Sequence, residues 1–366
     1  MKSEPHLFII WKNARDKQSE ILSEIDKNLR IVEVSEVQWS DEYFSSNMTR
    51  FYGQKLPDRS FKEKHCGKGP FLLVICEDLD PKYRDRDTIS RSVESVNINL
   101  FDMKQKFRGM TGGGHKIHAT NNPIETNHDL TLLLGVNIED YNISRKPNWD
   151  NKISKLQRDL SGSNGWKSAE EMFYVMNACE EYVVLRNFEC LPEELTISGH
   201  DDVDFLVRNY DNFVFLINGR KVFNIKYRVH FELDVGDQRI LCDIRSVGDD
   251  YYQGKWQEEI LKTRMKHKCF YIPNEKQHKF SVLYHAIIHK KIIAEDYKSR
   301  LKSWFKTDDI GFLESNLQEF MISEDFIFVE PKDLSVFYNY QNMSFRRITF
   351  NLWLGFKLRL RRALNV

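Results

Sequence analysis

The sequence has few cysteines, and none of them lies in a pattern that binds zinc. The six cysteines among 366 residues never form a CxxC pair, which excludes a zinc ribbon and favours a reducing compartment. No run of 18 apolar residues occurs, and the apolar stretch near the N-terminus is too short for a signal peptide. We therefore expect a cytoplasmic protein.

An excess of charge of one sign is also missing. Lys+Arg and Asp+Glu both number 54, so the formal net charge at pH 7 is zero, and nucleic acid is not an expected partner. The exception is the stretch 346–362, where basic residues are interleaved with apolar ones and no acid occurs after Asp333. This basic C-terminus is typical either of a peripheral membrane helix or of a helix packed on its own protein. A nucleic-acid patch is a weaker alternative, because basic residues are not concentrated elsewhere in the chain.

The first part of the chain alternates strand-like and helix-like patterns. Residues 6–11 and 71–76 are apolar runs of strand length, whereas Ile21 and Ile25 lie four apart, as on a helix. A polar stretch over residues 144–167, rich in Ser, Asn, Gly and Lys, predicts a domain linker. Residues 1–143 therefore predict one mixed α/β domain.

The second part opens with a helix whose first turn carries a capping pattern, Ser168 followed by Glu171. Strand candidates then come in quick succession, before a helical pattern begins at residue 253. They are residues 182–186, 203–207, 212–217, 228–235 and 239–245. The fold class predicted is α+β, with a mixed sheet over 168–252 and a helical subdomain with the basic tail over 253–366.

Acidic residues interrupt two of these strand candidates. Asp202 and Asp204 are separated by one residue, so their side chains would share one face of a strand. Asp243 interrupts another apolar run, with Glu232 and Asp234 as weaker candidates for a third acid. Adjacent carboxylates are costly unless a cation lies between them, and Mg²⁺ takes carboxylate and phosphate oxygens. The alternative is a solvated, Asp-rich turn that leads into an ordinary strand.

This pattern resembles the polymerase-beta-type nucleotidyltransferases, and more narrowly minimal members associated with bacterial surface-polysaccharide genes. The resemblance covers residues 168 to 300, and it implies that Asp202 and Asp204 bind Mg²⁺ (or Mn²⁺) and the triphosphate of a nucleoside triphosphate. It implies that Asp243 helps to activate the acceptor hydroxyl, with a sugar or polyol phosphate as acceptor. Gly199 and His200 are the corresponding nucleotide-binding candidates.

A second informative stretch lies in the first domain. Three glycines at 112–114 precede His115 and His118, and Asp129 follows eleven residues after His118. A histidine that carries a phosphoryl group needs one ring nitrogen free and the other held by an acceptor. The alternative is that both histidines are loop or core residues satisfied by backbone hydrogen bonds.

The spacing resembles nucleoside diphosphate kinases, a family with a ferredoxin-like domain. The resemblance implies that His118 carries a phosphoryl group beside Asp129, and it points to an oligomer. It also implies a set of nucleotide-binding residues, namely Lys12, Tyr52, Arg108 and His115.

Together these patterns predict magnesium-dependent nucleotidyl or phosphoryl transfer from a nucleoside triphosphate to a small or polymer-linked acceptor. One alternative is a kinase that acts through a phosphohistidine at His118, which could also supply phosphate to the second domain. The other is a scaffold that binds nucleotide without catalysis. His285 and His289 lie four apart in an apolar helical pattern, and we interpret them as core residues.

Overall fold

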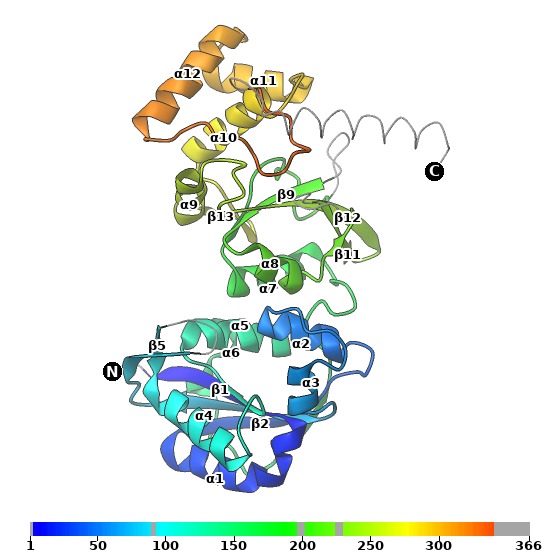
Figure 1. Cartoon of the computed structure of the whole chain (residues 1–366), viewed down its shortest axis with the longest axis vertical. Coiled ribbons are helices and arrows are strands. Elements are labelled where there is room, and N and C mark those ends of the chain that lie inside the picture. Colours follow the sequence, from blue (N-terminus) through cyan, green and yellow to red (C-terminus); the bar gives the residue numbers. More distant parts are fainter. Residues whose placement is uncertain (1–2, 89–92, 196–201, 224–229, 340–366) are drawn as a thin grey trace. The chain divides into compact units, whose positions relative to one another are not determined.

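The computed structural model describes residues 3–88, 93–195, 202–223 and 230–339 of the chain. Contacts divide the chain into two compact units, Met1–Trp166 and Lys167–Val366. Both units combine helices with a five-stranded β-sheet, so the fold is α+β, as predicted (Figure 1).

The first unit is built on a sheet with the strand order β6-β1-β3-β2-β7. Its strands are β1 (Glu4–Ile10), β2 (Arg30–Gln38), β3 (Phe71–Asp78), β6 (Ile117–Ala119) and β7 (Ser154–Gln157), with a separate hairpin of β4 (Tyr83–Arg86) and β5 (Glu94–Asn97). Its helices are α1 (Gln18–Asn28), α2 (Phe44–Tyr52), α3 (Phe61–Cys66), α4 (Ile98–Met110), α5 (Pro123–Leu134) and α6 (Ile138–Tyr141), and short 3-10 turns cover Lys12–Lys17 and Ile143–Arg145.

Helices cover both faces of this sheet (Figure 1). The central strand β3 is buried along its whole length, which is why it reads as a continuous apolar run. The helices α1 and α4 pack on one face of the sheet through a core that includes Phe8 and Ile10, whereas α2 and α5 lie over the other face (Figure 1). Strand β1 pairs antiparallel with both β3 and β6, so β6 is placed beside the N-terminal strand.

The predicted linker over 144–167 is wrong, because residues 144–166 belong to the first unit. Within it, β7 pairs parallel with β2 and extends the sheet. The chain beyond β7 is held by the guanidinium of Arg50, which donates hydrogen bonds to Ser161 and Ser163. Trp166 is buried at the end of this stretch. The sequence did not predict β7, because this strand is polar and none of its side chains is buried.

The second unit carries the mixed sheet β10-β11-β12-β9-β8. Its strands are β8 (Tyr182–Val184), β9 (Asp202–Val207), β10 (Arg220–Lys221), β11 (His230–Val235) and β12 (Gln238–Ser246), and β13 (Met265–His267) pairs with β14 (Phe270–Ile272). Its helices are α7 (Ala169–Cys179), α8 (Tyr210–Leu216), α9 (Gly254–Lys262), α10 (Glu275–Ile288), α11 (Glu295–Phe305) and α12 (Ile310–Ser323).

Local signals account for most of these elements. The predicted cap of α7 is confirmed, since the hydroxyl of Ser168 accepts from the backbone N–H of Glu171. The strand expected at 212–217 is wrong, because this stretch lies in α8. Asn209 caps that helix, and Phe213 and Leu216 are buried three residues apart, which is helical spacing.

The helices after residue 253 share one core with the sheet, so the predicted division between 252 and 253 does not separate two units. Val183 and Leu206 of the sheet belong to the same cluster as Trp256 of α9 and Tyr284 of α10. Among the helices that the structure describes, none is both long enough and apolar enough to cross a membrane.

We expect Phe8→Ala to lower the free energy of unfolding of the first unit by about 3–5 kcal/mol, because it leaves a cavity in a fully buried core. The matched control is Phe61→Ala, because the Phe61 side chain is 76% exposed. We expect its effect to stay within about 0.5 kcal/mol. Denaturant unfolding of both variants tests this, and equal effects would contradict the described core.

Candidate functional site

The acidic residues of β9 and β12 gather on one face of the second sheet. In the parallel register, Asp204 lies opposite Asp243, and Asp202 stands two residues earlier on β9. Alternate residues of a strand share a face, so the three acids lie on the same side. His230 on β11 is opposite Asp243 in the antiparallel register. Ligand atoms of Asp202, His230 and Asp243 all lie within 4.8 Å of one another.

The carboxylate of Asp204 is engaged by a buried arginine. Nη2 of Arg186, just after β8, donates to Oδ1 of Asp204 at 2.5 Å, and both side chains are buried. Burial raises the pKa of Asp204 to about 7; the Arg186 charge opposes this shift, and the charges of Asp202 and Asp243 add to it. Asp204 therefore belongs to an internal ion pair as well as to the acidic face.

Asp243 has partners of its own. Its carboxylate contacts the imidazole of His230 and lies 3.7 Å from the guanidinium of Arg245, which also donates to Asp333 at 3.1 Å. Burial alone would raise the pKa of Asp243, but the His230 contact and the Arg245 charge outweigh it and lower that pKa. Asp243 is therefore ionised at neutral pH.

A buried aromatic ring connects the two arginines to the helices. The guanidinium carbons of Arg245 and Arg186 lie 4.3 Å and 5.9 Å from the ring centre of Tyr251. The Tyr251 hydroxyl shares a 2.6 Å hydrogen bond with Nδ1 of His285. Both His285 and His289 are buried on or beside α10, which confirms their interpretation as core residues, and burial lowers the pKa of His285 well below its usual value.

The donor set on this face fits a divalent cation, since it offers two carboxylates and one imidazole within reach of a single ion. The structure thus brings Asp202 and Asp243 together, and Asp204 joins them in register. The sequence reading missed His230, Arg186 and Arg245, and only the positions of Arg186 and Arg245 in apolar runs could have indicated buried charge partners. The candidates Gly199 and His200 lie outside the described residues.

The histidine site of the first unit forms where β6 meets α5. Nε2 of His118 and Oδ2 of Asp129 lie 2.6 Å apart, and the other oxygen of Asp129 lies 2.9 Å from Nδ1 of His128. Burial alone would raise the pKa of Asp129, but the two histidines outweigh it and lower that pKa. Glu125 is close enough to form a possible metal cluster with His118 and Asp129, and burial raises its pKa.

Two aromatic residues of α2 line His118. The rings of Phe51 and Tyr52 lie 5.2 Å and 5.9 Å from the imidazole, in edge-on geometry. The Tyr52 hydroxyl accepts from the indole of Trp11 at 3.0 Å, and Nζ of Lys62 lies 3.2 Å from the centre of the Tyr52 ring. The predicted residue Tyr52 is therefore part of the His118 site.

The other predicted nucleotide residues make contacts around the loop after α3 and along β6. Nζ of Lys12 donates to the carbonyl of Lys68 at 2.9 Å. The backbone N–H of His115 donates to Nδ1 of His65 at 3.0 Å, and Nε of Arg108 donates to the carbonyl of Ile117 at 3.1 Å. Arg108 is therefore next to His118 along β6. The described contacts link Lys12 to the loop after α3 and His115 to α3 itself.

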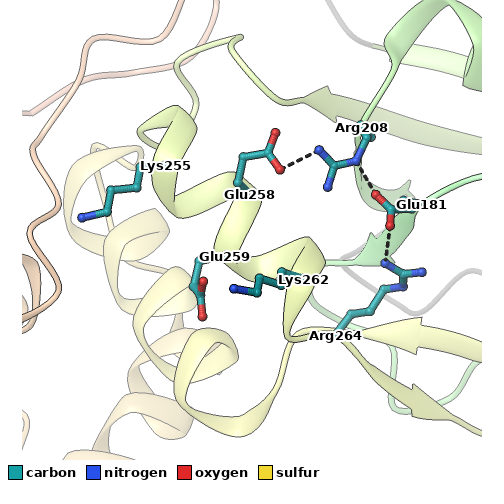
Figure 2. Close-up of a pocket in the computed structure, with 7 residues that line it drawn as sticks. All are labelled: Glu181, Arg208, Lys255, Glu258, Glu259, Lys262 and Arg264. Carbon is teal, nitrogen blue, oxygen red and sulfur yellow. Dashed lines mark hydrogen bonds and ion pairs between the residues drawn. The ribbon is translucent and has the colours of Figure 1, made fainter. Parts of the chain in front are cut away.

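A pocket on the second unit is lined only by charged side chains, as Figure 2 shows. Arg208 pairs with Glu181 and Glu258, and Arg264 pairs with Glu181 at 3.4 Å (Figure 2). The remaining lining residues are Lys255, Glu259 and Lys262. Acids thus alternate with bases, which is typical of a solvated surface, and the acidic face of the sheet does not line this pocket.

Comparison with known proteins gives only limited similarity. No protein-family model matches the chain, and no curated protein matches it. Among solved structures, the chain is similar to an orthorhombic crystal form of the Aquifex aeolicus nucleoside diphosphate kinase, over 35% of this chain and 93% of the kinase, at 19% identity and a TM-score of 0.24. At this level the similarity carries no argument about the function of this chain.

A buried network behind His118 generates a pH prediction. His6 is fully buried, and its ring nitrogens lie 3.1 Å from Oγ1 of Thr120 and 3.2 Å from Nδ2 of Asn97. Burial lowers the pKa of His6 to about 4, although the charge of Asp78 opposes this. The folded protein therefore keeps His6 neutral at a pH where the unfolded chain takes up a proton.

We expect the His6 contribution to stability to be complete above pH 6.5 and lost as the pH falls towards 4, by about 3 kcal/mol. The variant His6→Gln should remove this part of the acid sensitivity. Denaturant unfolding of both proteins at several pH values between 7 and 4 measures the difference. Parallel pH profiles for the two proteins would contradict the buried neutral state of His6.

Proposed function

We propose that the second unit transfers a nucleotidyl or phosphoryl group from a nucleoside triphosphate to a small or polymer-linked acceptor, with the help of a divalent metal ion. One observation carries the proposal: Asp202 and Asp243 converge within ligand distance on one sheet face, with Asp204 in register beside Asp243. The parallel pair of acid-bearing strands also supports the resemblance to polymerase-beta-type nucleotidyltransferases.

The residues of the acidic face would divide the work between them. Asp202 and Asp243 would hold the ion, which supplies neutralising charge to the phosphate oxygens when it is bound. Asp243 is ionised and would accept a hydrogen bond from the acceptor hydroxyl, so that its oxygen is positioned for in-line attack on phosphorus. Attack by this oxygen would form the new P–O bond as the bond to the leaving group breaks, which is pyrophosphate in nucleotidyl transfer and a nucleoside diphosphate in phosphoryl transfer. The hydroxyl proton would pass to Asp243.

The buried arginines favour an anionic substrate. Nη1 of Arg186 and Nε of Arg245 are buried and have no hydrogen-bond partner within the described parts of the chain. Both guanidinium charges lie beside the acids of this face and offset part of its negative charge, which favours an anionic substrate there. A sugar or polyol phosphate as acceptor rests on the family resemblance alone.

We expect Asp202→Asn and Asp243→Asn each to lower transfer of an α-phosphate label from ATP by about a hundredfold or more, because charge stabilisation by the ion is worth several kcal/mol. The assay offers a panel of sugar and polyol phosphates and compares α- and γ-labelled ATP. The matched control is Asp234→Asn, on the same sheet but paired with Arg220, which should keep full activity.

Other outcomes of this assay decide against the proposal. Transfer of the γ label instead, unaffected by either substitution, would assign the activity to a kinase site elsewhere in the chain. Nucleotide binding that is indifferent to the divalent ion, together with the absence of any transfer, would favour the non-catalytic scaffold.

A second candidate function is a phosphohistidine at His118, favoured by the hydrogen bond to Asp129. Asp129 holds Nε2, so Nδ1 is the atom available for attack on the γ-phosphorus. The N–P bond would form as the bond to the β-phosphate oxygen breaks and a nucleoside diphosphate leaves. The antiparallel strands β6-β1-β3-β2 follow the β-α-β-β-α-β order, with α2 and α3 inserted before β3 and the β4-β5 hairpin after it. This order supports a ferredoxin-like kinase-type domain.

We expect wild-type protein incubated with γ-labelled ATP to acquire an acid-labile label that His118→Ala abolishes, because no other atom takes the role of Nδ1. Asp129→Asn should reduce the labelling, since it removes the charge that orients the ring. The control is His267→Ala in the second unit, which should label like wild type. Undiminished label on His118→Ala would end this candidate.

A further inference from the structure

The residues of the second unit that could hold a metal ion include a histidine. His230 begins β11 and pairs in register with Asp243 of β12. One ligand atom each from Asp202, His230 and Asp243 lies within 4.8 Å of the other two. These three residues come from three adjacent strands in the order β11-β12-β9, so the hydrogen-bonded backbone already holds them close together.

The third acid of this face, Asp204, already forms a buried ion pair. Asp204 lies on the same face, but its Oδ1 accepts a hydrogen bond from Nη2 of Arg186 at 2.5 Å, in a buried ion pair. Breaking a buried ion pair leaves an uncompensated charge, which costs several kcal/mol. Recruiting Asp204 as a metal ligand would expose Arg186 to that cost. Asp243 also lies near a buried arginine, but Arg245 is 3.7 Å away and donates to Asp333 at 3.1 Å. Arg245 therefore keeps a carboxylate partner when Asp243 binds an ion. The available set is therefore two carboxylates and one imidazole.

This set does not match the preference of Mg²⁺, which takes oxygen ligands and keeps several waters. Imidazole nitrogen is a ligand of first-row transition ions, and a mixture with carboxylates suits Mn²⁺ or a neighbouring ion of that row. We propose that this centre holds a single first-row transition ion in preference to Mg²⁺, and that His230 is the residue that sets the preference.

The inference rests on the proposed function, because it specifies the ion of the same site. It changes the expectation drawn from the sequence, in which Asp202, Asp204 and Asp243 hold Mg²⁺ (or Mn²⁺) and no histidine takes part. Here Asp204 with Arg186 is a positioning pair that fixes the neighbouring strand, and His230 takes the third ligand place.

The experiment measures direct binding of Mn²⁺ and Mg²⁺ to the full chain by titration calorimetry, without nucleotide. The first unit has its own potential metal cluster of His118, Glu125 and Asp129. Every protein in the comparison therefore carries His118→Asn, which removes one donor of that cluster. In this background we compare the parent with His230→Asn, Asp202→Asn and the control Asp234→Asn, and thermal unfolding without metal checks that each is folded.

We expect the parent to bind one equivalent of Mn²⁺ more tightly than Mg²⁺. His230→Asn should weaken Mn²⁺ binding by at least about tenfold, because even substitutions outside the ligand set cost that much. It should leave Mg²⁺ binding nearly unchanged, so the preference collapses. Asp202→Asn should weaken the binding of both Mn²⁺ and Mg²⁺, whereas Asp234→Asn should change the binding of neither ion.

Two results would overturn the inference. The first is a ratio of Mn²⁺ to Mg²⁺ affinity that is the same in the parent and in His230→Asn. The second is binding of two equivalents of ion to the second unit. Neither result touches the proposed function if α-label transfer still depends on Asp202 and Asp243. Conversely, the expected binding pattern without transfer to any acceptor would refute the function and leave the assignment of His230 intact.

Discussion

Neutralisation of buried carboxylates by two arginines is the constraint on which the second unit depends. The parallel register places Asp204 beside Asp243, and like charges on facing residues are destabilising. Arg186 compensates Asp204, and Arg245 lies between Asp243 and Asp333. The same guanidinium groups pack against Tyr251 and so tie the sheet to the helices that follow it. The two arginines therefore balance the charge of the acids and pack in the core at the same time.

Much of this face could be predicted from spacing, because alternation along a strand needs no knowledge of the rest of the chain. Two observations were enough to place three acids together. Asp202 and Asp204 are separated by a single residue, and Asp243 is the only acid in its apolar run. The role of Arg186 could not be predicted, since its partner Asp204 is 18 residues away along the chain. His230 was missed for a related reason. Its position opposite Asp243 depends on the register of β11 against β12, and the sequence alone does not give that register.

The first unit shows the same division between local and distant information. His118 and Asp129 meet because a short turn joins β6 to α5, and the side chain of Asn122 caps that helix next to Pro123 at its start. Such signals are local and can be read in advance. The α2 residues around His118 and the contacts of Lys12 and His115 depend on long-range packing. The linker failed as a prediction because β7 owes its place to backbone pairing with β2 rather than to apolar side chains.

That late strand has a consequence for how the first unit is made. Because β7 covers the outer edge of β2, a ribosome must release the chain well past the last helix of this unit before the sheet is closed. Until then, β2 presents unsatisfied amide and carbonyl groups, which are a template for pairing with another chain. A shortened piece that stops at residue 143 would keep that edge open permanently, so recombinant work on this half of the molecule should retain everything through Trp166.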